Sequence, residues 1–267
     1  MAGILNIQIN SLAGEKEINL GKIEYYIKKN TDKKLDLVVM PEFFSTNIDY
    51  HKTPEDKTGG ETINFIQNLA RKYSINIIAG TIARKFENKM YNTSFAINRE
   101  GKIIAKYDKI HLYNYMGGNE GANITAGDKI VTANFDFAKV GMAICFDARY
   151  PLHFNKLIKE NVDIIVLPAC WIVPTEIYKD ENSLKYAQDM WITLNRTRAY
   201  DNMVYYIVSN QTKECGNRLY AIGTSMIISP TAEILAKAEN KECALYADIE
   251  IENVKYLKSL FPIADID

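Results

Sequence analysis

Three short segments contain the side chains best suited to nucleophilic chemistry. They are MPEFF at 40–44, KYDKIHLY at 106–113 and AICFDARYP at 143–151. Each segment ends or directly follows a predicted strand. Groups presented at the carboxyl ends of strands converge on one face of an α/β fold, so we expect Glu42 and Cys145 to meet there.

Cys145 is the candidate nucleophile. It follows the apolar run VGMAI and precedes a predicted helix start near Pro151. This strand-turn-helix order is that of a nucleophile elbow, which exposes the side chain and aims a following backbone N–H at the reacting carbon. The alternative is a buried structural cysteine, a common setting for an unpaired thiol. A nucleophilic cysteine needs an acidic and a cationic partner nearby, whereas a structural cysteine does not.

Glu42 and Lys109 are the partners that the sequence offers. Glu42 follows a buried run and is flanked by one proline and two phenylalanines, an apolar setting that suits a general base for a thiol. Lys109 lies among apolar residues, where its ammonium could be held rigidly and offset charge developing on an oxygen. The ordinary alternatives are a capping or salt-bridging role for Glu42 and an exposed edge-strand position for Lys109.

The elements that must position these residues follow an α/β pattern. Short apolar runs rich in β-branched residues predict strands, and stretches with helical apolar spacing lie between several of them. The strand runs are 4–10, 35–40, 75–81, 90–97, 140–144, 162–169 and 203–210, and the helical stretches contain 18–27, 63–73 and 154–158. Near-continuous hydrophobicity in 35–40 and 162–169 indicates strands covered on both faces. Hairpins turning at Glu100-Gly101 and around Pro230 add antiparallel pairing, so we expect mixed sheets.

Composition favours one domain that acts on a small molecule. At 267 residues with 47% hydrophobic side chains, the chain can bury a large core, and no linker or repeat divides 1–267. The 32 basic and 33 acidic residues nearly cancel, which argues against nucleic acid or an anionic membrane as a partner. No run approaches the roughly 20 apolar residues of a membrane span, and the first residues lack a signal-peptide pattern. We therefore expect a cytoplasmic protein.

The four cysteines and three histidines show no metal-binding or disulfide pattern. The cysteines are scattered without a CxxC pair, and the histidines form no HExxH or His-rich tract. We therefore expect neither a disulfide framework nor a dedicated transition-metal site. Apolar residues near the C-terminus, from Leu257 to Ile263, need cover from the same chain or from another subunit, and both options stay open.

Together and in this order, the three segments resemble those of the nitrilase superfamily, the carbon-nitrogen hydrolases with a Glu-Lys-Cys triad. The resemblance covers essentially the whole chain, since GTSMIISPTAEILA resembles the family's late hairpin and RTRAYDNMVYYIVSN its helix-to-strand segment. Glu120, followed by Gly127 and Asp128, matches the family's second glutamate in sequence context. CFDARYP is closer to the CYD-x-RFP of the omega-amidase-like branch than to the CWE of true nitrilases, which favours an amide substrate.

The resemblance implies a role for each matching residue. Glu42 would be the general base, Cys145 the nucleophile and Lys109 the cation that stabilises the oxyanion. The backbone N–H of Phe146 would be the second oxyanion donor, and Glu120 would hold Lys109 and the substrate amide in place. The implied fold is a four-layered α-β-β-α sandwich, usually dimerised across one helical layer, so we expect a homodimer or a higher homo-oligomer. No cofactor would be required.

The expected reaction is hydrolysis of a small amide through a thioester, with release of ammonia. Arg149 could clamp a substrate carboxylate, as in monoamides of dicarboxylic acids, but internal pairing with Asp147 or another acid is the favoured interpretation. Tyr113 and Trp171 are candidate pocket walls, although large aromatics after strands are as often plain core. The segment 172–190 is longer than in compact omega-amidase-like proteins, which predicts an altered pocket wall or lid.

Three alternatives stay open. The same triad could hydrolyse an N-carbamoyl amine or amino acid, or a nitrile. A cysteine-histidine hydrolase is the nearest rival mechanism, because His111 lies two positions from Lys109 and would share its face in a strand. A protein of a different class, a catalytically silent scaffold, would have an inert Cys145 thiol.

Overall fold

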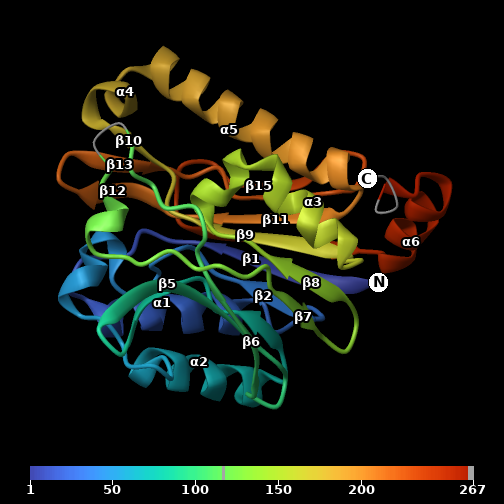
Figure 1. Ribbon diagram of the computed structural model, residues 1–267, viewed down its shortest axis with the longest axis horizontal. Coiled ribbons are helices and arrows are strands. Elements are labelled where there is room, and N and C mark those ends of the chain that lie inside the picture. The colour runs from blue at the N-terminus through green and yellow to red at the C-terminus, as the bar shows by residue number, and fades with distance from the viewer. Residues whose placement is uncertain (116–117, 264–267) are drawn as a thin grey trace.

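The layers of the molecule are visible in a computed structural model that describes residues 1–115 and 118–263. Figure 1 shows helices on both outer faces and two sheets between them. One outer layer contains α1 (Lys16–Lys29) and α2 (Gly60–Tyr73), and the other contains α3 (Pro151–Lys159) and α5 (Glu181–Asn202). The predicted four-layered α-β-β-α sandwich is confirmed.

Two large mixed sheets form the inner layers. The first has the strand order β16-β1-β2-β3-β5-β4, with β6 pairing β5, and the second has the order β15-β14-β11-β9-β8-β7. The first sheet consists of β1 (Ala2–Gln8), β2 (Leu37–Val39), β3 (Asn76–Ile78), β4 (Ile82–Phe86), β5 (Lys89–Ile97), β6 (Ile103–Asp108) and β16 (Cys243–Ile249). The second consists of β7 (Thr132–Asn134), β8 (Lys139–Met142), β9 (Ile164–Ala169), β11 (Tyr205–Asn210), β14 (Met226–Ile228) and β15 (Ile234–Lys237). The central strands of each sheet run parallel and their outer neighbours antiparallel.

Strand β2 shows why its sequence is continuously apolar. Leu37 and Val39 belong to the buried cluster that reaches into the second sheet, whereas Val38 belongs to the cluster beneath the outer helices. Ile23 of α1 and Ile66 of α2 belong to that second cluster, and all five side chains are fully buried. Each such side chain stabilises the fold by about 1.5–3 kcal/mol. The prediction that this strand is covered on both faces is therefore confirmed.

Both predicted hairpins are present in the sheets. Strands β5 and β6 pair antiparallel with Ile97 opposite Ile103, so the turn contains Gly101, whose φ is 72°. Strands β14 and β15 pair antiparallel with Ile228 opposite Ile234, on either side of the predicted turn. Antiparallel pairing at these edges confirms the expected mixture of strand directions.

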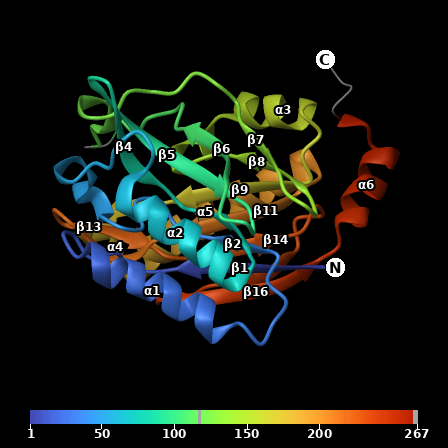
Figure 2. The same ribbon diagram turned by 90° about the horizontal axis from the view of Figure 1, so that it is seen from below.

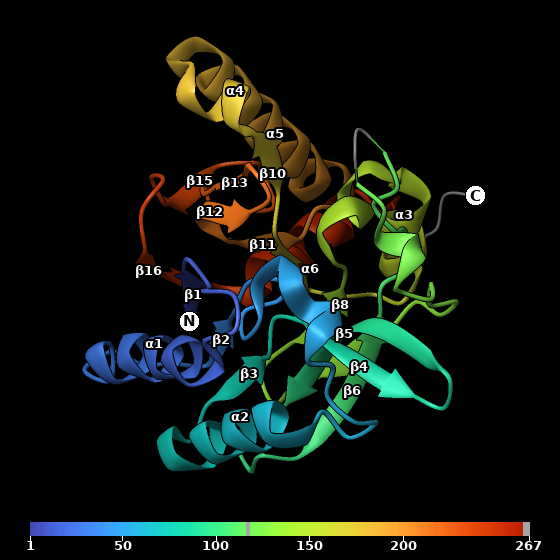
Figure 3. The same ribbon diagram turned by 90° about the vertical axis from the view of Figure 1, so that its left-hand side faces the viewer.

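A third sheet of three strands, which the sequence analysis missed, covers one end of the sandwich. Its order is β10-β13-β12, with β10 (Ile172–Pro174), β12 (Thr212–Gly216) and β13 (Leu219–Ile222). Helix α4 (Thr175–Lys179) follows β10 directly, and Figure 3 looks onto this end of the molecule. The segment 172–190 thus folds as a strand, a short helix and the beginning of α5. Its role as a pocket wall or lid stays a prediction.

The C-terminal helix α6 (Ile251–Leu260) lies at the end of the molecule that also holds the N-terminus (Figure 2). Val254 is fully buried, and Ile263 packs against the main core, whereas Leu260 and Phe261 are each 53% exposed. Packing on the same chain therefore covers this apolar segment only in part. Residues 264–267 lie outside the described part of the chain. Among the described residues, no helix combines the length and apolar composition needed to cross a bilayer.

Candidate active site

The predicted functional side chains meet beyond the carboxyl ends of strands from both large sheets. Glu42 follows β2 and Lys109 follows β6 of the first sheet, whereas Cys145 follows β8 of the second. Lys109 Nζ lies 2.9 Å from Glu42 Oε1. The charges of Glu42 and Lys109 also act on the Cys145 thiol, so the three side chains form one cluster.

The turn that carries Glu42 is fixed by a close approach of two backbones. Gly80, with φ 34°, packs against Pro41 so closely that a Cβ atom there would lie 2.1 Å from the Pro41 carbonyl oxygen. The hydroxyl of Thr81 accepts a hydrogen bond from the Phe43 N–H at 2.9 Å, and Gln211 Nε2 donates to the Glu42 carbonyl at 2.7 Å. Only glycine fits this contact without displacing the backbone.

The carboxylate of Glu42 has hydrogen-bond donors at both oxygens. Its Oε1 accepts hydrogen bonds from Lys109 Nζ at 2.9 Å and from Asn92 Nδ2 at 2.8 Å. Its Oε2 accepts a hydrogen bond from the backbone N–H of Cys170 at 2.8 Å. The side chain is almost completely buried, so these donors replace the water that a carboxylate otherwise needs.

Lys109 is buried between two carboxylates. Its Nζ lies 2.8 Å from Glu120 Oε2 in addition to its contact with Glu42. Burial alone would lower the pKa of Lys109, but Glu120 and Glu42 outweigh it and hold this pKa well above its ordinary value. The backbone N–H of Tyr113 donates to the same Glu120 oxygen at 2.8 Å. Lys109 is therefore a fixed ammonium beside the thiol.

Cys145 begins a short 3₁₀ helix, Cys145–Arg149, and has a left-handed backbone with φ 44°. The preceding residue, Ile144, is extended with φ −133°, so the chain reverses sharply at the cysteine. A β-carbon makes this conformation costly, and such strain is characteristic of nucleophile elbows. Burial, followed by the Glu42 carboxylate, raises the pKa of the Cys145 thiol well above its ordinary value, while Lys109 opposes this rise. The thiol therefore keeps its proton and needs a base to become a nucleophile.

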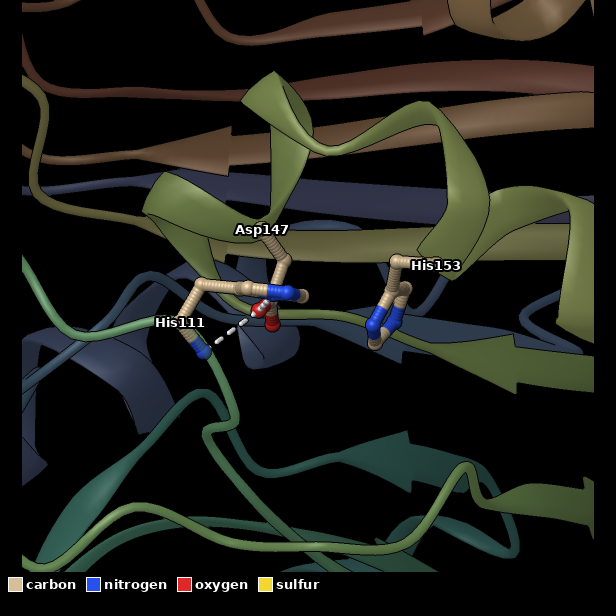
Figure 4. A group of neighbouring side chains, drawn as sticks. All are labelled: His111, Asp147 and His153. Atoms are coloured by element: carbon tan, nitrogen blue, oxygen red, sulfur yellow. Dashed lines mark hydrogen bonds and ion pairs between the residues drawn. The ribbon is translucent and has the colours of Figure 1, made fainter.

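Asp147 holds this turn from inside (Figure 4). Its Oδ1 accepts hydrogen bonds from the His111 backbone N–H at 3.1 Å and from His111 Nδ1 at 2.7 Å. Its Oδ2 accepts hydrogen bonds from the Tyr107 hydroxyl at 2.7 Å and from the Ile144 N–H at 2.8 Å. Burial opposes ionisation, but His111, His153 and Tyr107 together hold the pKa of Asp147 below its ordinary value. The ionised carboxylate thus ties the elbow to the segment that carries Lys109.

The cluster of His111, Asp147 and His153 has side chains of the types that bind metal ions, with ligand atoms within 4.8 Å of one another. Figure 4 shows the three side chains close together, with the His111 ring against the Asp147 carboxylate. Each Asp147 oxygen already accepts two hydrogen bonds, which use its lone pairs. An ion would have to displace the His111 ring. Because these contacts fix the elbow, we interpret the cluster as a hydrogen-bond network.

The four predicted substrate-binding residues contact one another in two pairs, Tyr113 with Phe146 and Arg149 with Trp171. The ring centroids of Tyr113 and Phe146 are 5.3 Å apart, and the Trp171 ring lies at a tilt against that of Trp191 of α5, with centroids 4.3 Å apart. Burial, followed by the nearby Cys145, raises the pKa of Tyr113, and Arg149 opposes this rise. Tyr113 therefore lies within electrostatic reach of both residues.

The favoured interpretation of Arg149 was wrong. Asp147 binds Tyr107 and His111 instead, and Arg149 makes no ion pair with any residue in the described ranges 1–115 and 118–263. Its guanidinium lies over the Trp171 ring, 5.3 Å from the centroid, and the residue is exposed. Because Asp147 points into the elbow, its neighbour two positions later remains available to solvent.

Two groups of the cluster were missed by the sequence analysis. The first is Asn92 in β5, which donates to Glu42 and, at 3.0 Å, to Glu120 Oε1. The second is the backbone N–H of Cys170, directly after β9. A buried asparagine within an apolar strand was a usable signal for Asn92, because such a side chain needs polar partners. A backbone donor carries no signal in the residue types.

The sandwich fold and the buried glutamate-lysine pair beside a strained cysteine have the organisation of a cysteine-dependent hydrolase. The sequence profile described as Carbon-nitrogen hydrolase matches residues 6–258, so the chain belongs to the carbon-nitrogen hydrolase family. The expected class of enzyme is thereby confirmed.

Relatives of known name agree with the predicted branch. The omega-amidase of Homo sapiens is 27% identical over 267 residues, which cover 97% of this chain and 92% of the relative. The 2-oxoglutaramate amidase of Bacillus subtilis is 27% identical over 261 residues, covering 97% of this chain and 95% of the relative. The crystal structure of Nit3 of Saccharomyces cerevisiae, a member of branch 10 of the nitrilase superfamily, aligns with a TM-score of 0.85. It is 25% identical, and the alignment covers 98% of this chain and 94% of that one.

Proposed function

We propose that the protein is an amidase that hydrolyses the terminal amide of a small molecule through a thioester on Cys145. The observation that carries this proposal is the buried contact between Lys109 and Glu42, at 2.9 Å, whose charges both act on the Cys145 thiol. A base, a cation and a nucleophile in one cluster are the groups that acyl transfer requires.

In the first half of the reaction the enzyme is acylated. Glu42 takes the thiol proton, and the sulfur of Cys145 attacks the carbonyl carbon of the amide. The Lys109 ammonium and the Phe146 N–H stabilise the tetrahedral oxyanion. The carbon-nitrogen bond then breaks, and the nitrogen leaves as ammonia with the proton that Glu42 returns.

In the second half water releases the acyl group. Glu42 accepts a proton from a water molecule, whose oxygen attacks the thioester carbon, and the same two donors stabilise the second oxyanion. The carbon-sulfur bond breaks, the carboxylate product leaves, and Cys145 regains its proton from Glu42. Glu120, in contact with Lys109, holds the ammonium in place through both halves.

We further propose that the substrate carries a carboxylate, as a monoamide of a dicarboxylic acid does. Arg149 supports this, because its exposed guanidinium is unpaired within the described ranges and lies over Trp171, near Tyr113. A planar guanidinium binds a carboxylate through two parallel hydrogen bonds. The names of the relatives, omega-amidase and 2-oxoglutaramate amidase, point to the same class of substrate.

The test is ammonia release from a panel of small amides, ureido acids and nitriles, with wild type compared with Cys145→Ala. Hydrolysis of 2-oxoglutaramate or a related monoamide that disappears in the variant supports the proposal. Preferential turnover of the ureido acids or nitriles would replace it with one of the alternatives. Absence of turnover together with a thiol that resists alkylation would favour the catalytically silent scaffold.

We also propose a homodimer joined through the helical layer of α3 and α5. Large apolar side chains on these helices are exposed, including Leu152 at 75%, Tyr186 at 67% and Tyr200 at 58%. Both helices lie on the same outer face in Figure 1. Light scattering during size exclusion measures the mass, and a monomer for wild type would refute this assembly. Tyr186→Glu is expected to weaken the dimer, because it buries a charge at the interface.

A further inference from the structure

We propose that Asn92 is a positioning residue that holds the Glu42 and Glu120 carboxylates in fixed orientations. This inference rests on the proposed function of the cluster. Asn92 lies in β5, is fully buried, and donates from Nδ2 to Glu42 Oε1 at 2.8 Å and to Glu120 Oε1 at 3.0 Å. One amide group therefore bridges the proposed base and the carboxylate that holds Lys109.

The hydrogen-bond inventory of the Asn92 amide explains why an asparagine suits this position. Its NH₂ group has two hydrogens, and one is directed at each glutamate. Its Oδ1 is buried and has no hydrogen-bond partner among the described residues. A buried unsatisfied acceptor is unfavourable, so an apolar side chain of the same shape would fit the strand better. The polar side chain is therefore useful at this position for its two donors.

The charges of the cluster make these donors important. Two buried carboxylates, Glu42 and Glu120, face a single ammonium, that of Lys109. Two like charges in one buried site resist simultaneous ionisation. Asn92 supplies a hydrogen bond to each carboxylate while adding neither a charge nor an exchangeable acid. It can thus keep the Glu42 carboxylate oriented for its contact with Lys109 and for transfer of the Cys145 proton.

The backbone of Asn92 also positions Lys109. Its carbonyl oxygen accepts a hydrogen bond from the Lys109 N–H at 2.9 Å, directly after the paired residues Thr93 and Asp108. The strand register that places Asn92 between the glutamates therefore also sets where the Lys109 side chain starts. A side-chain substitution leaves this backbone bond available, so it tests the amide donors separately.

The experiment compares Asn92→Leu with wild type over a range of pH. Loss of both donors is expected to lower kcat about 100-fold, less than loss of the base itself, while KM stays unchanged. The acidic limb of the kcat/KM profile should move to higher pH, because the carboxylates then protonate more easily. Asn92→Asp, which adds a third carboxyl group, should move this limb further in the same direction.

Asn76→Leu is the matched control. Asn76 is also a buried strand asparagine whose Nδ2 has two acceptors, the Asp36 carbonyl at 3.0 Å and Asp136 Oδ1 at 2.6 Å. It makes no contact with the glutamates of the cluster. Its substitution is expected to lower the melting temperature while the dependence of kcat/KM on pH stays the same as in wild type. A displaced profile in this control would mean that lost stability alone explains the Asn92 effect, and would overturn the inference.

Alkylation of Cys145 by iodoacetamide, followed by mass spectrometry, separates this inference from the proposed function. If wild type hydrolyses nothing in the panel, the pH dependence of alkylation still reports the Glu42-assisted thiol. Slower alkylation in Asn92→Leu, with the acidic limb of its pH profile moved to higher pH, supports the inference. A wild-type rate and profile in a folded Asn92→Leu protein would refute it. Should that variant not fold, Asn92→Ser retains one hydroxyl donor and should give an intermediate rate, whereas a wild-type rate would again refute the inference.

Discussion

Two buried networks flank Cys145, and they use charge differently. In the first network, Glu42, Lys109 and Glu120 oppose one another as charged groups. In the second network, the single charge of Asp147 is surrounded by a hydroxyl, a ring nitrogen and two backbone N–H groups. The first arrangement places a base and a cation where a proton and an oxyanion need them. The second fixes the backbone that presents the thiol.

This difference predicts opposite consequences for substitutions in the two networks. A change in the charged network should reduce the rate more than the stability, because the remaining partners still balance one another. A change at Asp147 should reduce stability more than rate, because backbone donors buried around the turn lose their acceptor. The thiol between them depends on both networks.

The largest expected effect is that of Cys145→Ala. Removal of the nucleophile should lower the rate of ammonia release by about 10⁴-fold or more, because no other group can form the thioester. The melting temperature should not fall, because alanine at position 145 leaves the hydrogen bonds and ion pairs of both networks in place. Retention of wild-type activity in this variant would show that Cys145 is not the nucleophile, and the two networks would then have no catalytic thiol to serve.

Glu42→Gln is expected to have the next largest effect. It preserves the shape of the side chain but removes the base, so kcat should fall about 10³-fold. Stability should change little, because Lys109 keeps its contact with Glu120. His111→Ala is the control for a cysteine-histidine mechanism and should retain most activity. The opposite ranking, with His111→Ala inactive and Glu42→Gln active, would establish the rival mechanism.

Asp147→Asn should be the largest change in stability. The amide nitrogen would replace one carboxylate oxygen, so its hydrogens would face either the His111 N–H and ring or the Ile144 N–H and the Tyr107 hydroxyl. The expected cost is about 3 kcal/mol in the free energy of unfolding. Urea denaturation at neutral pH measures this quantity. A variant with full stability and a severe loss of kcat would show that Asp147 acts in the chemistry, and the distinction between the networks would fail.

The contribution of Asp147 should also depend on pH. Because its pKa is depressed in the folded protein, the carboxylate adds stability above the unfolded value of about 3.9 and loses it as the pH falls through the folded value. The stability difference between wild type and Asp147→Asn should therefore be constant near neutrality and shrink below about pH 4. Urea denaturation across this range measures it, and a difference that grows on acidification would contradict the assignment.

Arg149→Met should have the smallest effect and should depend on the substrate. For a monoamide that carries a carboxylate, loss of the guanidinium should raise KM about tenfold, equivalent to 1.4 kcal/mol. For a neutral amide of similar length the kinetics should not change. Equal effects on both substrates would indicate that Arg149 supports the turn rather than recognising the carboxylate.

Much of the architecture followed from local patterns along the chain. Continuous apolar runs predicted strands covered on both faces, and Val38 with its neighbours shows why, since alternate side chains enter different clusters. The missed hairpin of β12 and β13 had a usable signal, because Gly216 ends β12 and Asn217 follows it in the turn to β13. Patterns of period two and 3.6 can be read from sequence because neighbouring residues alone produce them.

The sequence by itself determined which residues could react, since Glu42, Lys109 and Cys145 each stand next to a predicted strand. Only the tertiary structure decided how their neighbours are paired. Asn92 bridges partners 50 and 28 positions away, and Asp147 binds side chains 36 and 40 positions away rather than Arg149 two positions along. Such pairings depend on strand register and on how the two sheets pack, because a buried polar group takes whichever donors the fold brings within reach.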